Sequence, residues 1–349
     1  MTTFAIVGAG MMGSAMCWPL SDNHHKVRLV GTPLDEEIIT SIRQKRFHPT
    51  LERTIPDDVE AFSYTQLSEA IQGADVIIGG ISSFGVEWFA QTVGPFMLPE
   101  VPVLSVTKGL ESKPDGDLII LPDALDSKIP APQKGTIRFN AIGGPCIAHE
   151  LAARRQTCVV FTGKNLTTLE YLQQLLSTPY YHIWTSTDPI GVETCAALKN
   201  AYAMGVGLAA GMMDNAGPDG LANMYNPQAV LFGQSCYEMR KLLEVMGGGI
   251  DNVTWLPGAG DLFVTVFGGR TVRLGMMLGR GIPFSRAREI LAGVTLESVE
   301  IITRVCRAMP KLAERGKIRK EDFPLLLHMY DILHNDNKVQ IPWERFFYQ

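Results

Sequence analysis

The stretch that decides the fold is "FAIVGAGMMGSAMCWPL", residues 4–20. A short apolar run, typical of a buried strand, ends in three glycines, and a helix-forming segment begins at the last of them. In a dinucleotide-binding turn the first glycine makes the tight turn, the second lets the backbone approach the pyrophosphate, and the third lets helix and strand pack closely. We assign these parts to Gly8, Gly10 and Gly13, and we expect the backbone of Met11 and Met12 to cover the pyrophosphate at the helix N-terminus.

The end of the second predicted strand does not say which dinucleotide binds. The run "KVRLVG" ends near Thr32, about 20 residues after the turn, where NAD-binding folds often carry an Asp or Glu for the ribose hydroxyls. Here the first carboxylate, Asp35, comes three residues later, and no Arg stands at that position to attract a 2′-phosphate. The sequence therefore predicts NAD or NADP and leaves the choice open.

Apolar runs alternate with helical segments through the first half of the chain. The predicted strands are "FAIVG", "KVRLVG", "ADVIIGGI", "VPVLSV", "IRFNAIGG" and "TCVVFTG". Continuous apolar strands that alternate with helices are typical of a parallel sheet covered on both faces, so we predict a Rossmann-type doubly wound α/β domain. After "STDPIG" the apolar residues follow helical spacing. We therefore expect a nucleotide-binding domain over residues 1–187 and an all-α substrate-binding and catalytic domain over residues 188–349.

Size, charge and cysteine pattern narrow the function. With 349 residues, of which 46% are hydrophobic, the chain is long enough for two globular domains. A net charge of −5 argues against a nucleic-acid partner, because such proteins need a concentrated basic surface. The six cysteines form no CxxC pair and the seven histidines no HxxxH pair, so we expect no metal site. The apolar segment "NAYAMGVGLAAGMM" is shorter than the about 20 residues of a membrane span and is predicted to be a buried helix.

The two ends of the chain bear on location and assembly. The N-terminus runs almost at once into the glycine turn and carries no export signal, so we expect a cytoplasmic protein. The C-terminal end "IPWERFFYQ" contains Trp343, Phe346, Phe347 and Tyr348, which are too apolar to lie in solvent. We expect this end to dock on its own subunit or on a dimer partner, and we predict a homodimer that binds a small-molecule substrate.

Four further segments carry residues suited to chemistry. Lys108 in "SVTKGLES" follows a predicted strand, and it should lie at the carboxyl edge of the sheet, where ligands bind in such folds. The segment "AIGGPCIAHELA" forms a second glycine turn at the same edge. Lys199 and Asn200 lie within the apolar helix "ETCAALKNAYAMGVGLAAGM". The last segment, "LPGAGDLFVTVFGGRTVRLG", offers Asp261, Thr265 and Arg270 among glycines.

Two of these charged residues allow both a functional interpretation, in catalysis or ligand binding, and a purely structural one. Burial within an apolar helix would remove solvation from the Lys199 ammonium and lower its pKa, which would suit it to proton exchange. Alternatively, the side chain extends past its apolar neighbours to water. Arg270 lies in "FGGRT", where glycines expose backbone N–H groups beside a guanidinium, as an oxyanion or phosphate site requires. It could otherwise be a solvated surface charge.

In this order along the chain, the blocks "TKG", "GP" followed by Ala and Glu, "ALKN" and "GDLFVT" with "GGR" resemble the NAD(P)-dependent glycerol-3-phosphate dehydrogenase family. The resemblance runs from the glycine turn to "GVTLESVE" and fades after about residue 310. It implies that Lys199 is the general acid/base, assisted by Asp261 and Lys108. The implied substrate-binding residues are Asn200, Thr265, Arg270, Thr271, Gly144 and Cys146. Lys108, Ala148, Arg270 and Glu297 join Thr32 and the glycine turn as the implied cofactor-binding residues.

The reaction that the resemblance implies is reduction of dihydroxyacetone phosphate by NAD(P)H to sn-glycerol 3-phosphate. Three positions depart from the family pattern. Thr271 follows the phosphate-binding arginine where the family usually has Asn, Cys146 replaces a hydroxyl residue in the "GP" turn, and the second strand ends in "GTPLDE". A thiol is a poor substitute for a hydroxyl as a hydrogen-bonding group. A related phosphorylated or acidic polyol therefore stays open as the substrate, and a protein that senses NAD(P) without turnover is the alternative from another class.

Overall fold

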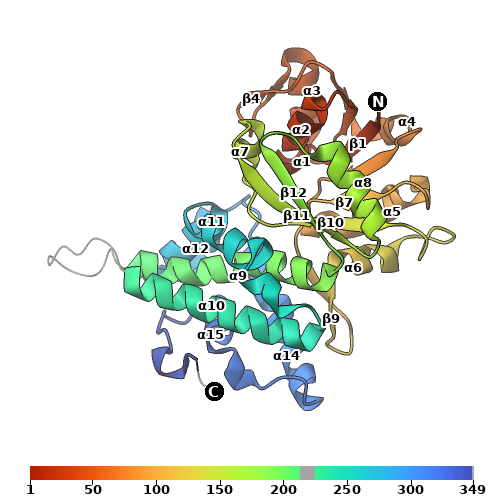
Figure 1. Cartoon of the computed structure of the whole chain (residues 1–349). Helices are drawn as coiled ribbons and strands as arrows, with labels where there is room; N and C mark the ends of the chain where they lie inside the picture. The colour runs from red at the N-terminus through yellow and green to blue at the C-terminus, as the bar shows by residue number, and fades with distance from the viewer. Residues whose placement is uncertain (213–224, 348–349) are drawn as a thin grey trace. The chain divides into compact units, whose positions relative to one another are not determined.

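The computed structural model describes residues 1–212 and 225–347. The chain divides into two compact units (Figure 1). Unit 1 consists of Met1–Lys108 and Ile120–Pro189, and unit 2 of Gly109–Ile119 and Ile190–Gln349. Unit 1 is therefore discontinuous in sequence, because the eleven residues that follow Lys108 pack with the second half of the chain.

Unit 1 is built on an eight-stranded sheet with the order β12-β11-β10-β7-β6-β1-β2-β5. The strands are β1 (Thr3–Val7), β2 (Lys26–Val30), β5 (Val59–Phe62), β6 (Val76–Gly79), β7 (Val103–Ser105), β10 (Phe139–Gly143), β11 (Thr157–Gly163) and β12 (Tyr181–Ser186). A small ribbon of β3 (Phe47–His48) and β4 (Arg53–Thr54) stands beside it. The first strand pairs with β2 and β6 on its two sides, so the glycine turn leaves the middle of the sheet.

All six predicted strands form in this sheet, but the prediction was incomplete and partly wrong. The pattern missed β5 and β12, because "VEAF" and "YHIWTS" mix polar and apolar residues. The sheet is also not wholly parallel, because β11 runs antiparallel to β10. An apolar run indicates that a strand is buried on both faces but carries no information about its direction.

Helices cover both faces of the sheet, as a doubly wound fold requires. Side chains of β1 alternate between the faces: Phe4 and Ile6 enter one core cluster, Ala5 and Val7 the other. The first face is covered by α1 (Met11–Ala15), α2 (Cys17–Asp22), α3 (Glu36–Lys45), α7 (Ala148–Ala152) and α8 (Leu166–Leu176). The second is covered by α4 (Leu67–Ile71), α5 (Val86–Thr92) and α6 (Leu121–Lys128). The predicted α/β class is confirmed.

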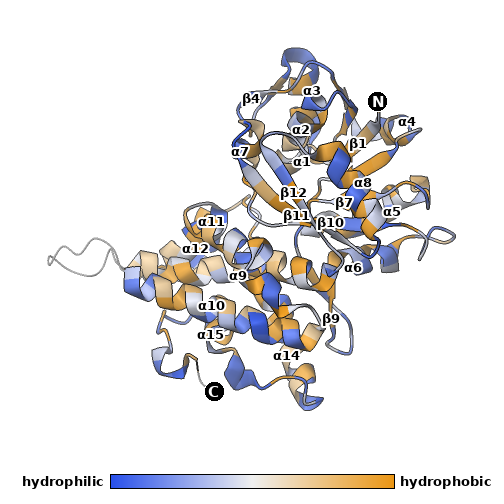
Figure 2. Cartoon of the chain, in the orientation of Figure 1, coloured by the Kyte–Doolittle hydropathy of each residue, from blue (hydrophilic) through white to orange (hydrophobic). Residues whose placement is uncertain are grey.

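Unit 2 is helical, as predicted. Its helices are α9 (Pro189–Met212), α10 (Tyr225–Met246), α11 (Asp261–Val266), α12 (Arg270–Gly279), α13 (Phe284–Ile290), α14 (Glu297–Glu314) and α15 (Pro324–Asn335). Of the segment predicted as a buried helix, residues 200–212 lie in α9, which begins at Pro189, and its last residue lies outside the described residues. Figure 2 shows apolar colour along much of this helix. In the ranges that the structure describes, no helix is long and apolar enough to cross a bilayer.

Two contacts fix the elements around α9. Helix α12 lies against α9 at backbone distance, because a Cβ on Gly275 would stand 2.2 Å from the Met204 carbonyl oxygen. Helices α9 and α10 lie side by side, joined by a hydrogen bond from the Tyr202 hydroxyl to Glu238 Oε2 at 3.0 Å (Figure 1). Small residues on one side and a buried polar contact on the other thus hold the helix that carries Lys199.

The segment after Lys108 is a hairpin of β8 (Leu110–Ser112) and β9 (Leu118–Ile120). Helix α14 anchors it: the Arg304 guanidinium donates a hydrogen bond of 2.7 Å to the Leu110 carbonyl oxygen and pairs with Glu111. The sequence analysis did not predict this hairpin, since "LES" and "LII" are too short to show a strand period.

Candidate active site

The three glycines of the turn face different neighbours. Gly8 has a φ of +112°, and a Cβ there would lie 2.6 Å from the backbone of Gly80. A Cβ on Gly13 would lie 2.2 Å from the Gly8 carbonyl oxygen. Around Gly10, by contrast, a Cβ would meet only the Gly80 carbonyl oxygen, at an ordinary 3.8 Å. The protein itself requires the first and third glycines, whereas the open space at Gly10 fits the close approach of a dinucleotide pyrophosphate.

At the end of β2, Asp35 turns back toward the glycine turn. Its Oδ2 accepts hydrogen bonds from the Thr32 N–H and the Thr32 hydroxyl, both at 2.8 Å, and from the Ala9 N–H at 3.1 Å. The sequence analysis placed Thr32 at the ribose position and left Asp35 without a role. Sequence spacing alone could not show that the backbone from Thr32 to Asp35 turns and brings the Asp35 carboxylate to the Ala9 N–H.

The other predicted residues of unit 1 gather at the same edge of the sheet. Lys108 Nζ donates a hydrogen bond of 3.2 Å to the carbonyl oxygen of Gly144, which has a φ of +106°. These residues follow β7 and β10, which run parallel, so their carboxyl ends meet. The remaining side chains pack against one core cluster and are Met11, Met12, Cys146 and Ala148. Unit 1 thus brings its predicted residues together, with Lys108 as the cation at this edge.

The centre of unit 2 is an ion pair between α9 and α11. Lys199 Nζ lies 2.5 Å from Asp261 Oδ1, and the two side chains are 12% and 0% exposed. The Thr265 hydroxyl, one turn along α11, donates to the Asp261 carbonyl oxygen at 2.6 Å. A carboxylate removed from water must be compensated by charge or hydrogen bonds. The two charges therefore compensate each other, and the Lys199 side chain ends at Asp261 and not in bulk water.

Asn200, beside Lys199 on α9, meets a second acidic residue. Its Nδ2 donates a hydrogen bond of 3.2 Å to Glu297 Oε2. Glu297 is the first residue of α14. The structure therefore brings together two residues that the sequence analysis assigned to different partners, Asn200 to the substrate and Glu297 to the cofactor.

Arg270 and Thr271 open helix α12. Gly269, with a φ of +96°, directly precedes α12. Arg270 follows as the first residue of this helix, and its side chain is exposed. Among the residues that the structure describes, no hydrogen bond or ion pair of the Arg270 guanidinium is present. Thr271 is buried. Since α12 packs on α9 at backbone distance, the guanidinium is carried by the helix that adjoins Lys199.

Residues 3–169 match the family model of the NAD-dependent glycerol-3-phosphate dehydrogenase N-terminus, and residues 188–344 match that of the C-terminus. The chain belongs to this family. Membership makes it a nicotinamide-dependent oxidoreductase that acts on a CH–OH group, with NAD or NADP as cofactor.

Individual relatives agree with the family. The chain is 32% identical to the NADP(+)-dependent glycerol-3-phosphate dehydrogenase of Archaeoglobus fulgidus, over 96% of both chains. It is 29% identical to the glycerol-3-phosphate dehydrogenase [NAD(P)+] of Bacillus thuringiensis, over 97% of this chain and 94% of the relative. The crystal structure of glycerol-3-phosphate dehydrogenase from Coxiella burnetii is similar in fold, with a TM-score of 0.80, 24% identity and coverage of 99% of this chain and 97% of that chain.

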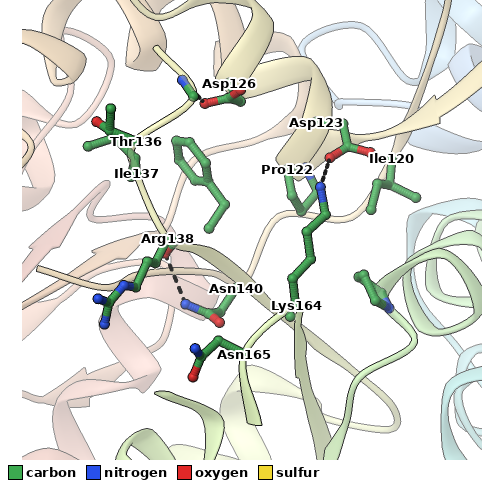
Figure 3. A pocket seen from close by; sticks show the side chains of 14 residues that line it. Ile120, Pro122, Asp123, Asp126, Thr136, Ile137, Arg138, Asn140, Lys164 and Asn165 are labelled. Carbon is green, nitrogen blue, oxygen red and sulfur yellow. Dashed lines mark hydrogen bonds and ion pairs between the residues drawn. The ribbon is translucent and has the colours of Figure 1, made fainter. Parts of the chain in front are cut away.

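Unit 1 also contains a pocket that none of the predicted site residues lines. It has a volume of about 290 Å³ and lies at the opposite edge of the sheet, where β10 begins and the antiparallel β11 ends. Figure 3 shows Lys164 reaching across it to Asp123, with Nζ 3.1 Å from Oδ1, and Asn140 beside them.

In the described ranges, no group of three His, Cys, Asp or Glu side chains is arranged to hold a metal ion.

Proposed function

We propose that this chain reduces dihydroxyacetone phosphate to sn-glycerol 3-phosphate with NADH or NADPH and catalyses the reverse oxidation. The single observation that carries the proposal is the buried Lys199–Asp261 pair, in a chain whose two halves both match the glycerol-3-phosphate dehydrogenase family. The proposal assigns cofactor binding to residues 1–187 and substrate binding and catalysis to residues 188–349. Lys108, at the carboxyl edge of the sheet in unit 1, assists with the substrate.

The residues proposed to hold the cofactor are those of the glycine turn, with Thr32 and Ala148. Gly10 leaves room for the pyrophosphate, and the backbone of Met11 and Met12 covers it. When bound, the nicotinamide supplies or accepts the hydride at the carbinol carbon. What the protein adds there is position and charge.

Lys199 is proposed to move the proton. As an ammonium it donates a proton to the carbonyl oxygen of the ketone while that carbon gains the hydride, and the C=O bond becomes CH–OH. In the oxidative direction the neutral amine takes the hydroxyl proton back. Asp261 supports this role by position, because its buried carboxylate lies 2.5 Å from the Lys199 Nζ and orients it.

Arg270 is proposed to bind the phosphate of the substrate. An exposed guanidinium at the first residue of a ten-residue helix joins a planar donor pair to the positive end of the helix. The departures from the family pattern at Thr271 and Cys146 keep a related phosphorylated or acidic polyol as the second candidate substrate.

Assembly and location are part of the same proposal. We expect a homodimer in the cytoplasm, acting in glycerophospholipid metabolism. All six cysteines lie in the described part of the chain, and no two of them form a disulfide. Sedimentation of the purified chain tests the dimer directly.

The decisive experiment follows the loss of reduced nicotinamide absorbance with dihydroxyacetone phosphate, using NADH and NADPH in turn. The wild-type chain should turn over at least one of them, and Lys199→Ala should lower kcat about 10²- to 10⁴-fold, the usual contribution of general acid catalysis. Lys164→Ala is the matched control, because this lysine also pairs with an aspartate but is 80% exposed in the remote pocket. It should keep wild-type rates.

Each outcome has a distinct meaning. Turnover that survives Lys199→Ala would remove the proposed acid/base. A chain that binds NADH tightly but reduces only another phosphorylated ketose would select the second substrate. Binding without turnover of any ketone in such a panel would favour the nucleotide-sensing alternative.

A further inference from the structure

The peptide groups around Ala9, between the first two glycines of the turn, are bonded to side chains from distant parts of the sequence. The Ala9 N–H donates to Asp35 Oδ2 at 3.1 Å. The Ala9 carbonyl oxygen accepts from His48 Nε2 at 2.9 Å and from the Ser14 hydroxyl at 3.1 Å. We call these three side chains, Asp35, His48 and Ser14, the Ala9 clamp. The sequence analysis gave none of them a role.

Each member of the clamp is itself fixed. Asp35 is held by the two hydrogen bonds from Thr32. His48 is fully buried, and its Nδ1 accepts a hydrogen bond of 3.1 Å from the Leu51 N–H. Since a carbonyl oxygen only accepts and an amide N–H only donates, the ring must be neutral with its proton on Nε2. Burial lowers the pKa of His48, which agrees with a neutral ring.

The clamp decides where the next amide points. A trans peptide is planar, so the carbonyl of Ala9 and the N–H of Gly10 point in opposite directions. Because His48 and Ser14 hold the carbonyl inside the protein, the Gly10 N–H faces outward. It has no acceptor among the residues that the structure describes, and the space over Gly10 is open. An outward N–H at an open glycine is what an anionic pyrophosphate requires.

We propose that His48 and Ser14 are positioning residues for the cofactor, which hold the Gly10 N–H toward the dinucleotide pyrophosphate before it binds, while Asp35 fixes the preceding Gly8–Ala9 peptide. The inference rests on the proposed function in one respect, namely that the dinucleotide binds at this turn. It gives Asp35 a task within the turn itself, since its Oδ2 accepts three hydrogen bonds from the protein.

Two isosteric replacements of His48 separate this role from simple packing. In His48→Gln the side-chain amide nitrogen can take the place of Nε2 and still donate to the Ala9 carbonyl, but nothing accepts from the Leu51 N–H. In His48→Asn the amide oxygen can take the place of Nδ1 and accept from Leu51, but nothing reaches Ala9. Each variant therefore loses one buried hydrogen bond, and only His48→Asn releases the clamp.

The measurement is the Kd for NADH and for ADP-ribose, from the quenching of protein fluorescence, together with the KM for the cofactor and kcat at saturation. ADP-ribose carries the pyrophosphate without the nicotinamide. His48→Asn should raise both Kd values and the cofactor KM about three- to tenfold, the worth of one buried hydrogen bond, and leave kcat unchanged. His48→Gln should stay within about twofold of wild type.

The outcomes are separable. Equal losses in the two variants would show that His48 acts only in packing, and unchanged affinity in His48→Asn would overturn the clamp outright. If His48→Asn proves too unstable to assay, Ser14→Ala tests the same carbonyl, since it removes the other donor, and unchanged affinity there would also count against the clamp. A wild-type chain that binds neither NADH nor NADPH would instead overturn the proposed function, and the clamp with it.

Discussion

At the scale of single residues, the glycine turn shows that identical residues in one motif serve different needs. Gly13 is required by the protein, because its Cα stands against the Gly8 carbonyl. Gly10 has room around it and an extended backbone, with φ −65° and ψ 171°, that any residue adopts. The proposed pyrophosphate contact would explain why this position lacks a side chain.

This difference predicts opposite results for two alanine variants. Gly13→Ala should destabilise the chain by about 3 kcal/mol, because the methyl group meets backbone that cannot move aside. Gly10→Ala should keep the free energy of unfolding within about 0.5 kcal/mol of wild type but raise the Kd for NADH more than about tenfold. Urea denaturation and NADH titration of both variants check this. Normal NADH affinity in Gly10→Ala would contradict the placement of the pyrophosphate.

At the scale of elements, three helices of unit 2 meet at one buried carboxylate. Glu238 on α10 accepts from the Tyr202 hydroxyl of α9 at 3.0 Å and from Gln234 Nε2 at 2.9 Å. It also accepts from the first amides of α15, the N–H groups of Leu325 at 2.7 Å and Leu326 at 3.0 Å. Burial nevertheless raises the pKa of Glu238 from 4.5 to about 7, since desolvation outweighs these hydrogen bonds.

A raised pKa in the folded state makes stability depend on pH in a definite direction. Between pH 4.5 and about 7 the folded chain binds a proton at Glu238 that the unfolded chain has released, so this contribution is present in acid and is lost as the pH rises. Glu238→Gln keeps a neutral side chain at every pH. The difference in free energy of unfolding between wild type and Glu238→Gln should therefore change by roughly 2 to 3 kcal/mol between pH 5 and pH 7.5, in favour of wild type in acid.

Urea denaturation at several pH values measures this slope. Glu244→Gln is the matched control, because Glu244 lies on the same helix and its carboxylate pairs with Arg240 at the surface. That variant should follow the wild-type pH dependence. If Glu238→Gln also followed it, the carboxylate would have to titrate alike in the folded and unfolded chains.

At the scale of the whole molecule, the C-terminal end closes on its own chain. Ile341 and Phe346 are buried, and the Phe347 N–H donates to Gln234 Oε1 at 3.1 Å. The Phe347 ring stands edge-on to Tyr237, 6.2 Å away between centroids. The sequence left open whether this end docks on its own subunit or on a dimer partner, and the structure shows it against α10 of its own chain. Tyr348 lies outside the described residues.

Removal of the segment from Ile341 onward tests this packing. The truncated chain should lose about 3 to 6 kcal/mol of stability, the worth of two buried apolar side chains, while its sedimentation coefficient should still report the oligomeric state of the full chain. Thermal denaturation and analytical ultracentrifugation give the two values. A change of oligomeric state with little loss of stability would mean that the segment belongs to a subunit interface instead.

Much of the architecture could be predicted because it rests on local patterns. The run from Phe4 to Val7 followed by spaced glycines specifies a strand, a turn and a helix within seventeen residues. The long apolar segment around Lys199 likewise predicted α9, because a helix that is apolar on all sides is typical of a buried one. Strands β5 and β12 and the direction of β11 were missed or wrong, since polar edge strands and strand direction leave no such period.

The sequence by itself determined the strand–turn–helix unit, the helical second half and the residue types that the chemistry needs. Only the tertiary structure decided which of them meet. Asp35 and His48 reach Ala9 across 26 and 39 residues, and Lys199 reaches Asp261 across 62. Contacts at such separations depend on how whole elements pack, and packing follows from the combined shape and burial of many side chains. The spacing of residues along the chain predicts local structure only. It therefore identifies candidate site residues but does not predict which of them are in contact in the folded protein.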